Sequence, residues 1–467
     1  MGEIKMKLDR PKLINVGLRS FYDSVRAQGA DVAHVDWRPP AGGDPELARL
    51  LAKLDRLEID EANKRAVAKI LAARPVLVDI KTAKDVIPGM TEHTILISGP
   101  PIEWERMSGP TKGAVWGALI YEGLAKDQKE ADKLVASGRI KFGACHDHDS
   151  VGPMAGIISP SMPVFIIENQ ENGKRTYSNF NEGLGKVLRY GAYEESVIKR
   201  LKWMEKTLAP VLSDALKRSG PIDLKAIMAQ ALHMGDELHC RNVASSLLFL
   251  KLMAPHIAET GFDKKEVGEV MKFMGENFLF FLNPAMAASK AMIDAAHNIE
   301  HCTVVTTLTR NGTDFGIRVS GLGNRWFTAP AEVPKLLCFP GFTEADANPD
   351  IGDSAIMETA GFGSFACAAS PAVVQVVGGS ASEAVEHTRE MWEICLAKDK
   401  SFSIPFLNFE GIPRGIDLRK VMDMGIFPII NTGVAHKKPG FGTVGFGILR
   451  APTECFKKAL QSFAEKY

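Results

Sequence analysis

Residues 13–40 carry the clearest pattern of hydrophobic and polar positions near the start of the chain. LINVG and ADVAHVDW have the length and the β-branched content of strands, and SFYDSVRAQG between them has helical spacing and ends at Gly29. A strand, an amphipathic helix and a second strand in this order are typical of a βαβ unit. We therefore expect a parallel sheet to begin here.

The next stretch alternates helices with short buried strands. Asp44 follows an Ala-Gly-Gly linker and can cap a helix that runs through Ala62 or beyond. Apolar runs predict strands at 75–80 and 94–98, helical spacing covers 112–137, and 157–167 is rich in strand-forming residues around a Ser-Pro turn.

The pattern changes between residues 184 and 295, where long helical repeats dominate and β-branched runs are few. Strand chemistry returns at 303–309, 314–320, 373–377, 426–430 and 444–449, with a helix over 382–397. The predicted fold class is α/β, with mixed α+β layers and an inserted, mainly helical domain. The predicted domains are an N-terminal βαβ-like unit (1–90), an α/β domain with a candidate anion loop (91–183), the helical domain (184–295) and a C-terminal α/β domain (296–467).

The composition is that of an ordinary globular protein without a global charge. Of the 467 residues, 45% are hydrophobic and 24% are charged, and 56 Lys and Arg balance 56 Asp and Glu. A neutral chain has no long-range field that favours nucleic acid or an anionic membrane. Any anionic ligand must therefore be held by a local group of residues.

Cysteine usage and the apolar segments indicate the compartment. The seven cysteines are scattered without a CxxC pair, which is typical of free thiols in a reducing cytosol. The amino terminus has no apolar stretch of signal-peptide length. The most apolar helical stretch, 243–258, is interrupted by Lys251 and Pro255 and is shorter than the ~20 residues that a membrane span requires. We expect a cytoplasmic protein that is not inserted in a membrane.

The densest group of titratable side chains is the run Cys-His-Asp-His-Asp at 145–149. It lies between FGA and the glycine-proline turn VGPMAG. Alternate residues of an extended segment point the same way, so His146 with His148, or Asp147 with Asp149, can converge as a general base and its orienting carboxylate. The alternative is a solvated loop whose aspartates make turn hydrogen bonds.

A glycine- and proline-containing loop at 99–113 connects the predicted strand TILIS to a helix. A strand, a loop and a helix amino terminus form a cradle for phosphate when free N–H groups face the ligand. Ser108, Gly109, Thr111 and Lys112 are the candidate phosphate-binding residues. An ordinary strand-to-helix connection explains the same residues.

The polar stretch GDELHCRN at 235–242 precedes the apolar helix over 243–252. Helix amino termini bind anions, so Glu237, His239, Arg241 and Asn242 are candidate substrate-binding residues. Simple capping of this helix by Asp236 or Asn242 is the alternative.

The loop NTGVAHKK leaves the strand FPII at its carboxyl end, where α/β sheets usually place ligands. Asn431, Thr432 and His436 are therefore further candidate substrate-binding residues. The following residues 440–445 match GxGxxG, but no strand directly precedes them and an extended segment follows, so we reject a dinucleotide site.

Two histidines at 297 and 301 have a spacing that can bind a metal from one helix face. No HExxH or CxxC pattern supports a metal site, and we assign neither a metal nor another cofactor. The Asn-Gly pair at 311–312 predicts a hairpin between TTLTR and DFGIRVS.

Several of these stretches together resemble the YlbE-like family, which includes the AllG-type subunits of oxamate carbamoyltransferase. The resemblance covers nearly the full chain and is carried by VGLRSFYDSVRAQGADVAHVDWRPPAGG, GPPIEWERMSGPTKGAVWGALIYEGLA, GDELHCRN, NPDIGDSAIMETAGFG and INTGVAHKKPGFGTVGFG. It implies the reaction of oxalurate with phosphate to give oxamate and carbamoyl phosphate in allantoin breakdown, or the same chemistry on a related small acid. It also implies an FdrA-type and an AllH-type partner subunit, in a complex that we expect to contain more than one copy of this chain.

Transfer of a carbamoyl group to phosphate needs a phosphate site, a donor for the carbonyl oxygen and a base near the nitrogen. We assign these roles from the residues alone, with Ser108, Thr111 and Lys112 on phosphate, His146 or His148 on the proton, and Arg241 on the substrate carboxylate. Two alternatives stay open. The chain can be a binding and assembly subunit whose FdrA-like partner carries the chemistry, or a metal-dependent amidohydrolase built on His146, His148, His297 and His301.

Overall fold

A small βαβ unit forms the amino-terminal end of the computed structural model, which describes residues 12–35, 37 and 39–467. Strand β1 (Lys12–Val16) and strand β2 (Asp31–Val35) pair in parallel, and α1 (Arg19–Ala27) connects them. The predicted strand-helix-strand order is confirmed. The sheet ends at two strands, however, and none of these three elements contains a buried residue.

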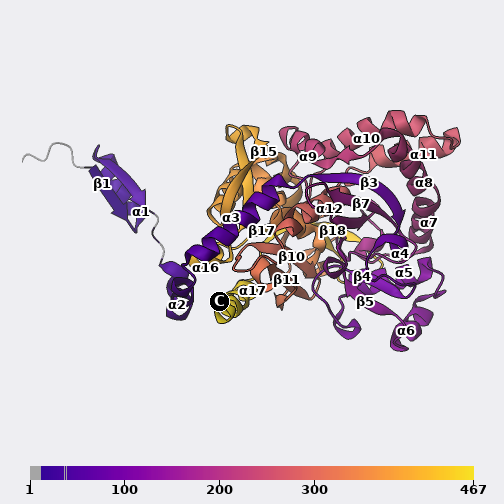
Figure 1. Ribbon diagram of the computed structural model, residues 1–467, viewed down its shortest axis with the longest axis horizontal. Coiled ribbons are helices and arrows are strands. Elements are labelled where there is room, and N and C mark those ends of the chain that lie inside the picture. Colours follow the sequence, from indigo (N-terminus) through magenta and orange to yellow (C-terminus); the bar gives the residue numbers. More distant parts are fainter. Residues whose placement is uncertain (1–11, 36, 38) are drawn as a thin grey trace, which may run out of the picture.

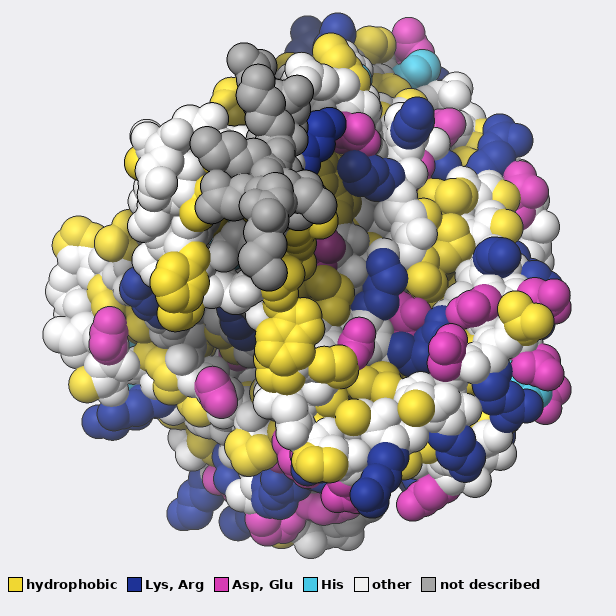
Figure 2. Space-filling model, turned by 90° about the vertical axis from the view of Figure 1, so that its left-hand side faces the viewer, with side chains coloured by type: hydrophobic (Ala, Val, Ile, Leu, Met, Phe, Trp, Pro, Cys, Tyr) yellow, Lys and Arg dark blue, Asp and Glu magenta, His cyan; other side chains and the backbone are white. Residues whose placement is uncertain are grey.

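This unit lies apart from the body of the protein in Figure 1 and exposes apolar side chains. Figure 2 looks onto this side of the molecule and shows hydrophobic side chains (yellow) at its surface. The exposed large apolar residues of this segment are Leu13, Ile14, Val16, Leu18, Phe21, Val35 and Trp37.

The strands form five further sheets in the body. The five-stranded sheet has the order β6-β8-β7-β3-β9, the four-stranded sheet β12-β11-β10-β14 and the three-stranded sheet β13-β18-β17, while β4-β5 and β15-β16 are pairs. The strands are β3 (Pro75–Thr82), β4 (Thr94–Ile97), β5 (Lys141–Ala144), β6 (Ser150–Val151), β7 (Pro163–Asn169), β8 (Arg175–Asn179), β9 (Ile222–Asp223), β10 (Val305–Asn311), β11 (Asp314–Val319), β12 (Phe327–Pro330), β13 (Lys335–Cys338), β14 (Ile351–Gly352), β15 (Cys395–Ile404), β16 (Glu410–Ile416), β17 (Ile429–Ala435) and β18 (Thr443–Arg450). The pair β4-β5 is parallel, and β10 and β11 form the hairpin that Asn311-Gly312 predicts.

Most of the helices lie in regions where helical spacing predicts them. They are α2 (Pro45–Lys53), α3 (Leu57–Ala72), α4 (Ala83–Val86), α5 (Gly109–Tyr121), α6 (Gln128–Ala136), α7 (Glu195–Trp203), α8 (Ala209–Ser219), α9 (Leu224–His233), α10 (Val243–Ala258), α11 (Lys264–Glu276), α12 (Leu282–Ile293), α13 (Ile356–Thr359), α14 (Val374–Val377), α15 (Ala381–Glu393), α16 (Leu418–Met424) and α17 (Thr453–Lys466). Asp44 caps α2 through its carboxylate, as predicted, but the helix ends at Lys53 and α3 starts separately at Leu57.

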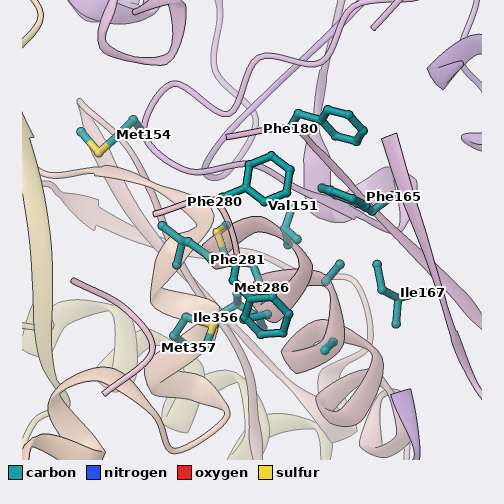
Figure 3. Packing of buried hydrophobic residues seen from close by; sticks show 14 of the residues in the cluster. Val151, Met154, Phe165, Ile167, Phe180, Phe280, Phe281, Met286, Ile356 and Met357 are labelled. Carbon is teal, nitrogen blue, oxygen red and sulfur yellow. The ribbon is translucent and has the colours of Figure 1, made fainter. Parts of the chain in front are cut away.

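Helix α12 lies at the centre of the molecule (Figure 1), and every one of its residues is buried. Its apolar side chains fill the space between the five-stranded sheet and the segment that contains α13. Figure 3 shows Phe281 and Met286 between Phe165 and Ile167 on one side and Met357 on the other. A helix that is apolar all round is stable only when it is enclosed in this way.

One predicted strand, 373–377, is wrong. These residues form the end of a short 3-10 turn and helix α14 instead. Val373 and Val377 are four positions apart and both are buried in one apolar cluster with Cys240 and Cys367. Packing on one helical face therefore outweighs the β-propensity of the valines.

The predicted fold class is confirmed, because helices and several sheets are mixed along the chain and the 184–295 region is mainly helical. The domain boundaries that we placed at residues 90, 183 and 295 stay predictions. In the ranges that the structure describes, no helix combines the length and the apolar character that crossing a bilayer would need.

Candidate active site

A polar cavity of about 530 Å³ opens where α12 ends beside the four-stranded sheet. Its floor and walls come from the turn after β5, the carboxyl end of α12, the hairpin β10-β11 and the loop before β12. The lining residues are His146, Asp147, Asp149, Lys290, Asp294, His297, Asn298, Thr307, Arg318, Gly323, Asn324 and Trp326. The carboxyl end of a parallel strand, here β5, is a usual place for a ligand in α/β proteins.

His146 lies in a short 3-10 turn, Cys145–His148, which starts directly after β5. The side chain of His146 is fully buried, and no described residue forms a hydrogen bond with either ring nitrogen. Burial lowers the pKa of His146 well below its usual value, and the positive charges of Lys290 and Arg318 lower it further. The imidazole is therefore neutral at pH 7 and can accept a proton.

Asp353 lies beside His146, with 3.7 Å between its Oδ1 and the imidazole Nε2. The carboxylate accepts hydrogen bonds from the backbone N–H groups of Gly99 and Gly152 and from the Thr309 hydroxyl. Asp353 thus connects strand β10 to the backbone that follows β4 and β6, around the turn that carries His146.

Arg318 enters the cavity from β11. Its neighbours Ile317 and Val319 face the apolar core, so the alternation of a strand sends Arg318 to the opposite face. The guanidinium carbon lies 3.9 Å from the centre of the Trp326 ring, and Nη2 donates a hydrogen bond to Asp147. Stacking on an indole fixes the plane of the guanidinium. Burial lowers the pKa of Arg318 to about 10, which leaves it charged at pH 7.

Lys290 is the second cation of the cavity and the only charged residue within α12. Its side chain is 3% exposed, and its ammonium lies 2.7 Å from the Asp294 carboxylate, which is 18% exposed. A lysine in the last turn of a helix also faces the negative end of the helix dipole. Both stabilising contacts are needed, because an unpaired ammonium is costly to bury.

The outer wall carries neutral polar groups. His297 follows α12, and its Nε2 lies 2.8 Å from the amide oxygen of Asn324. Asn298 adopts a left-handed conformation with φ of 59°, which asparagine tolerates better than most residues. Together with Thr307, these side chains offer hydrogen bonds around the two cations.

Of the four residues that we predicted as catalytic, His146, Asp147 and Asp149 line this cavity. His148 is not among the lining residues. Its Nδ1 lies 2.7 Å from the carbonyl oxygen of Pro88, and its ring packs on Gly143. Asp149 takes the left-handed conformation (φ 53°) that ends the turn, so successive side chains of this run point in different directions.

The predicted phosphate loop leads to the start of α5, outside the cavity wall. The hydroxyls of Ser108 and Thr111 lie 2.9 Å apart, and Thr111 also donates to the Asn311 carbonyl. A side chain at Gly109 would meet the carbonyl oxygen of Lys437. Lys112 lies over the Trp104 ring, 5.3 Å from its centre.

The predicted GDELHCRN and NTGVAHKK stretches meet each other at Glu358, away from the cavity wall. Its Oε1 lies 2.7 Å from His239 Nδ1 and accepts a hydrogen bond from the Asn431 backbone. Burial, together with the charge of Glu358, raises the pKa of Glu237 to about 8. The two stretches thus form a buried network of acidic side chains in which His239 is paired with Glu358.

The remaining predicted binding residues have structural partners. Asp236 accepts hydrogen bonds from Ser245 at the start of α10, so the capping interpretation holds for that acid. Arg241 donates to the Gly235 carbonyl, and Asn242 donates to the His239 carbonyl. Thr432 donates to Asp350, while His436 accepts from the Lys438 backbone and stacks on Phe441. Whether any of these residues binds substrate stays a prediction.

Sequence reasoning missed Lys290, Arg318 and Trp326, which complete the cavity. Two signals were present. Lys290 is a single charge in the apolar stretch LNPAMAASKAMI, and Arg318 is the only charge in the strand DFGIRV after its first residue, Asp314. A charge in an otherwise buried element is retained only with a partner or a ligand.

The four histidines of the metal-dependent alternative do not gather at one point. His146 and His297 line the cavity, His148 bonds to Pro88, and the His301 ring lies 4.3 Å from Tyr467. Within residues 12–35, 37 and 39–467, no group of three or more His, Cys, Asp or Glu side chains has the arrangement to hold a metal ion.

The fold and the cavity together define a mixed α/β protein with a polar internal cavity that is lined by two buried cations. Comparison with known proteins agrees with this class. The family model described as "Oxamate carbamoyltransferase subunit AllG" matches residues 140–354, a range that contains every residue of the cavity wall.

Two relatives and one solved structure extend the comparison. The chain is 46% identical to the "Uncharacterized protein YahG" of Escherichia coli K12 over 459 residues, 97% of each chain. It is 48% identical to the "Oxamate carbamoyltransferase subunit AllG" of the same organism over 410 residues, 87% of this chain and 98% of that one. A crystal structure of a conserved protein of unknown function from Enterococcus faecalis V583 is similar with a TM-score of 0.86 at 48% identity, over 87% of this chain and 98% of that chain. The chain belongs to the AllG family.

Proposed function

We propose that this chain is a subunit of an oxamate-type carbamoyltransferase and that the transfer takes place in the cavity around His146. The observation that carries the proposal is the pairing of a neutral, unpartnered imidazole with two buried cations, Lys290 and Arg318. The relative AllG is by name a subunit of oxamate carbamoyltransferase, and the matched segment contains the cavity wall.

The proposed reaction converts oxalurate and phosphate to oxamate and carbamoyl phosphate, or performs the same transfer on a related small acid. A phosphate oxygen attacks the carbamoyl carbon, and the bond from this carbon to the amide nitrogen breaks. The nitrogen takes up a proton as oxamate leaves. Neutral His146 accepts the proton from the attacking phosphate, and the imidazolium that forms returns this proton to the nitrogen.

The cations supply the electrostatic part of this mechanism. Negative charge develops on the carbamoyl oxygen as phosphate adds, and a fixed ammonium such as that of Lys290 stabilises it. The low exposure of the Lys290 side chain, 3%, strengthens this effect because little water screens the charge.

We also propose that the chain acts in a cytoplasmic complex with an FdrA-type and an AllH-type subunit, and that more than one copy is present. The name of the AllG relative, a subunit of an enzyme, supports a multi-subunit complex.

The test is a reconstituted complex that is supplied with oxalurate and phosphate while carbamoyl phosphate is measured. His146→Gln is expected to lower the rate at least about 100-fold, the usual contribution of a positioned acid-base group. His148→Gln tests whether His148 rather than His146 transfers the proton, and it is expected to have a much smaller effect. His93→Gln at the exposed surface serves as the control. Activity of the His146→Gln complex near that of the parent would end the proposal.

A non-catalytic role in binding and assembly, with the chemistry on the FdrA-like partner, is the second candidate function. The exposed apolar side chains of the β1-α1-β2 unit favour it, because surfaces of this kind often bind another protein. Under this alternative, the His146→Gln chain still assembles and the complex keeps its full rate, whereas removal of residues 1–37 prevents assembly.

A further inference from the structure

We propose that Arg318 binds the carboxylate of a small 2-oxo acid in the cavity and that Asp147 occupies Arg318 until this ligand takes its place. The inference rests on the proposed function for the location of the site. It names the chemical group that the site selects, and it moves the carboxylate-binding role from Arg241, which the sequence suggested, to Arg318.

The guanidinium of Arg318 is held in one orientation, but only one of the two N–H groups on its carboxylate-binding edge has an acceptor among the described residues. Its stacking on Trp326, at 3.9 Å from the ring centre, fixes the plane. Nη2 donates to one oxygen of Asp147, while no residue in the described part of the chain accepts a hydrogen bond from Nε. The Nε and Nη2 groups together form the edge that binds a carboxylate through two parallel hydrogen bonds. One hydrogen bond is therefore missing.

Asp147 has the properties of a replaceable partner. Its side chain is 35% exposed, whereas that of Arg318 is 5% exposed. Asp147 belongs to a short 3-10 turn, so its carboxylate can move to water without breaking a strand or a long helix. Moving the Asp147 carboxylate from Arg318 into water costs little free energy, because this carboxylate is already partly hydrated. The buried cation, by contrast, always needs an anion.

The same arrangement recurs at Lys290. There the acid, Asp294, is again more exposed than the cation, at 18% against 3%. Both cations lie on the inner side of the cavity and both acids lie nearer the solvent. A carboxylate ligand can thus take the place of the acid at Arg318, while Lys290 stays available for the carbamoyl oxygen.

The group that now occupies Arg318 is itself a carboxylate, which favours a carboxylate ligand over phosphate at this position. A planar carboxylate also matches the plane that Trp326 imposes on the guanidinium. The cavity of about 530 Å³ leaves room for a second anion beside the acid. We therefore assign the carboxylate to Arg318 and leave phosphate to the rest of the wall.

Isothermal titration of the full chain with oxamate tests the assignment without turnover. Arg318→Gln is expected to weaken oxamate binding roughly 30-fold or more, as expected when one partner of a buried charge pair is removed. Arg318→Lys keeps the charge but loses the second hydrogen bond, so an intermediate loss is expected. Arg325→Gln is the control, because Arg325 bonds to Ser462 and does not line the cavity.

Asp147→Asn tests the exchange. It removes the competing charge, so oxamate is expected to bind several-fold more tightly than to the parent chain. The ligand-free variant should melt at a lower temperature because Arg318 has lost its anion, and saturating oxamate should raise its melting temperature by more than it raises that of the parent. Unchanged or weaker oxamate binding by Asp147→Asn would overturn the exchange.

The remaining outcomes are distinct. Oxamate binding that is equal in Arg318→Gln and the parent overturns the carboxylate assignment. Loss of binding of inorganic phosphate, but not of oxamate, in this variant would show that Arg318 is a phosphate ligand instead. A chain that binds oxamate through Arg318 but supports no carbamoyl transfer in the complex supports this inference and refutes the proposed function. Full transfer by Arg318→Gln refutes the inference alone.

Discussion

Lys112 at the start of α5 and Lys290 in the cavity show how differently two similar sets of residues are used. Lys112 lies over the Trp104 ring near the surface, whereas Lys290 is buried and paired with Asp294. The hydroxyls of Ser108 and Thr111 bond to each other, whereas His146 and Arg318 in the cavity have nitrogens without a hydrogen-bond partner among the described residues.

The packing of the two regions differs in the same way. At the start of α5 they allow backbone to pack on backbone, since a side chain at Gly113 would meet the Gly191 carbonyl. The cavity instead keeps open space between polar side chains. A glycine-containing turn before a helix thus indicates close packing as readily as a ligand, and unsatisfied buried groups beside a cavity are the stronger sign of a site.

The largest effect is expected from Gly113→Ala. The new methyl group would meet the Gly191 carbonyl oxygen and lie 2.7 Å from Pro439, so unfolding free energy should fall by about 3 kcal/mol. Gly268→Ala in α11 is the matched control, because nothing lies within 4 Å of its methyl position, and it should stabilise by about 0.5–1 kcal/mol. Urea denaturation of both variants measures the difference. A stable Gly113→Ala chain would mean that the start of α5 has space for a ligand after all.

Next in size is the contrast between the two lysines. Lys290→Gln removes a charged hydrogen-bond donor from the cavity and should weaken oxamate binding about 10- to 100-fold. Lys112→Gln should change oxamate binding by less than roughly twofold, as surface substitutions usually do. Titration calorimetry under identical conditions compares them. If Lys112→Gln is the more damaging change, the anion site lies at α5.

The acid dependence of stability gives a third comparison. The pKa of His146 is lowered by burial and by nearby cations, so the unfolded chain binds the proton more readily. The stabilising contribution of His146 is complete above its unfolded pKa of 6.5 and is lost as the pH falls below it. Between pH 7 and pH 5 this amounts to at most about 2 kcal/mol.

His146→Gln should remove that part of the acid destabilisation, which melting curves from pH 5 to pH 8 can measure. Thr111→Val in α5 should leave the pH dependence as it is in the parent chain. An equal slope in parent and His146→Gln would show that folding does not lower the pKa of this imidazole.

The smallest effect is expected from Ser108→Ala. The change removes a hydrogen bond to Thr111 and should cost about 1 kcal/mol of stability, with the KM for phosphate changed by less than roughly twofold. Steady-state kinetics of the reconstituted complex provides both the KM and kcat. A tenfold rise of the KM for phosphate, with kcat retained, would return the phosphate site to α5.

The sequence predicted much of the local structure, because apolar spacing, caps and turn residues act over a few positions. Asp44 caps α2, and Asn311-Gly312 turns between β10 and β11. The prediction from sequence failed where residues distant in the chain decide the secondary structure. Val373 and Val377 are an example, because their common apolar neighbours make this segment helical. The sequence also predicted one continuous helix through Ala62 where the chain forms two, α2 and α3.

For the site, the sequence by itself determined the titratable run at 145–149 and the family to which the chain belongs. Only the tertiary structure decided which of these side chains share a cavity, because His146 meets Lys290 and Arg318 across more than 140 positions of sequence. Burial depends on what packs around a residue, and so do the pKa of an imidazole and the pairing of a cation. None of these is encoded by the residues next to it in the chain.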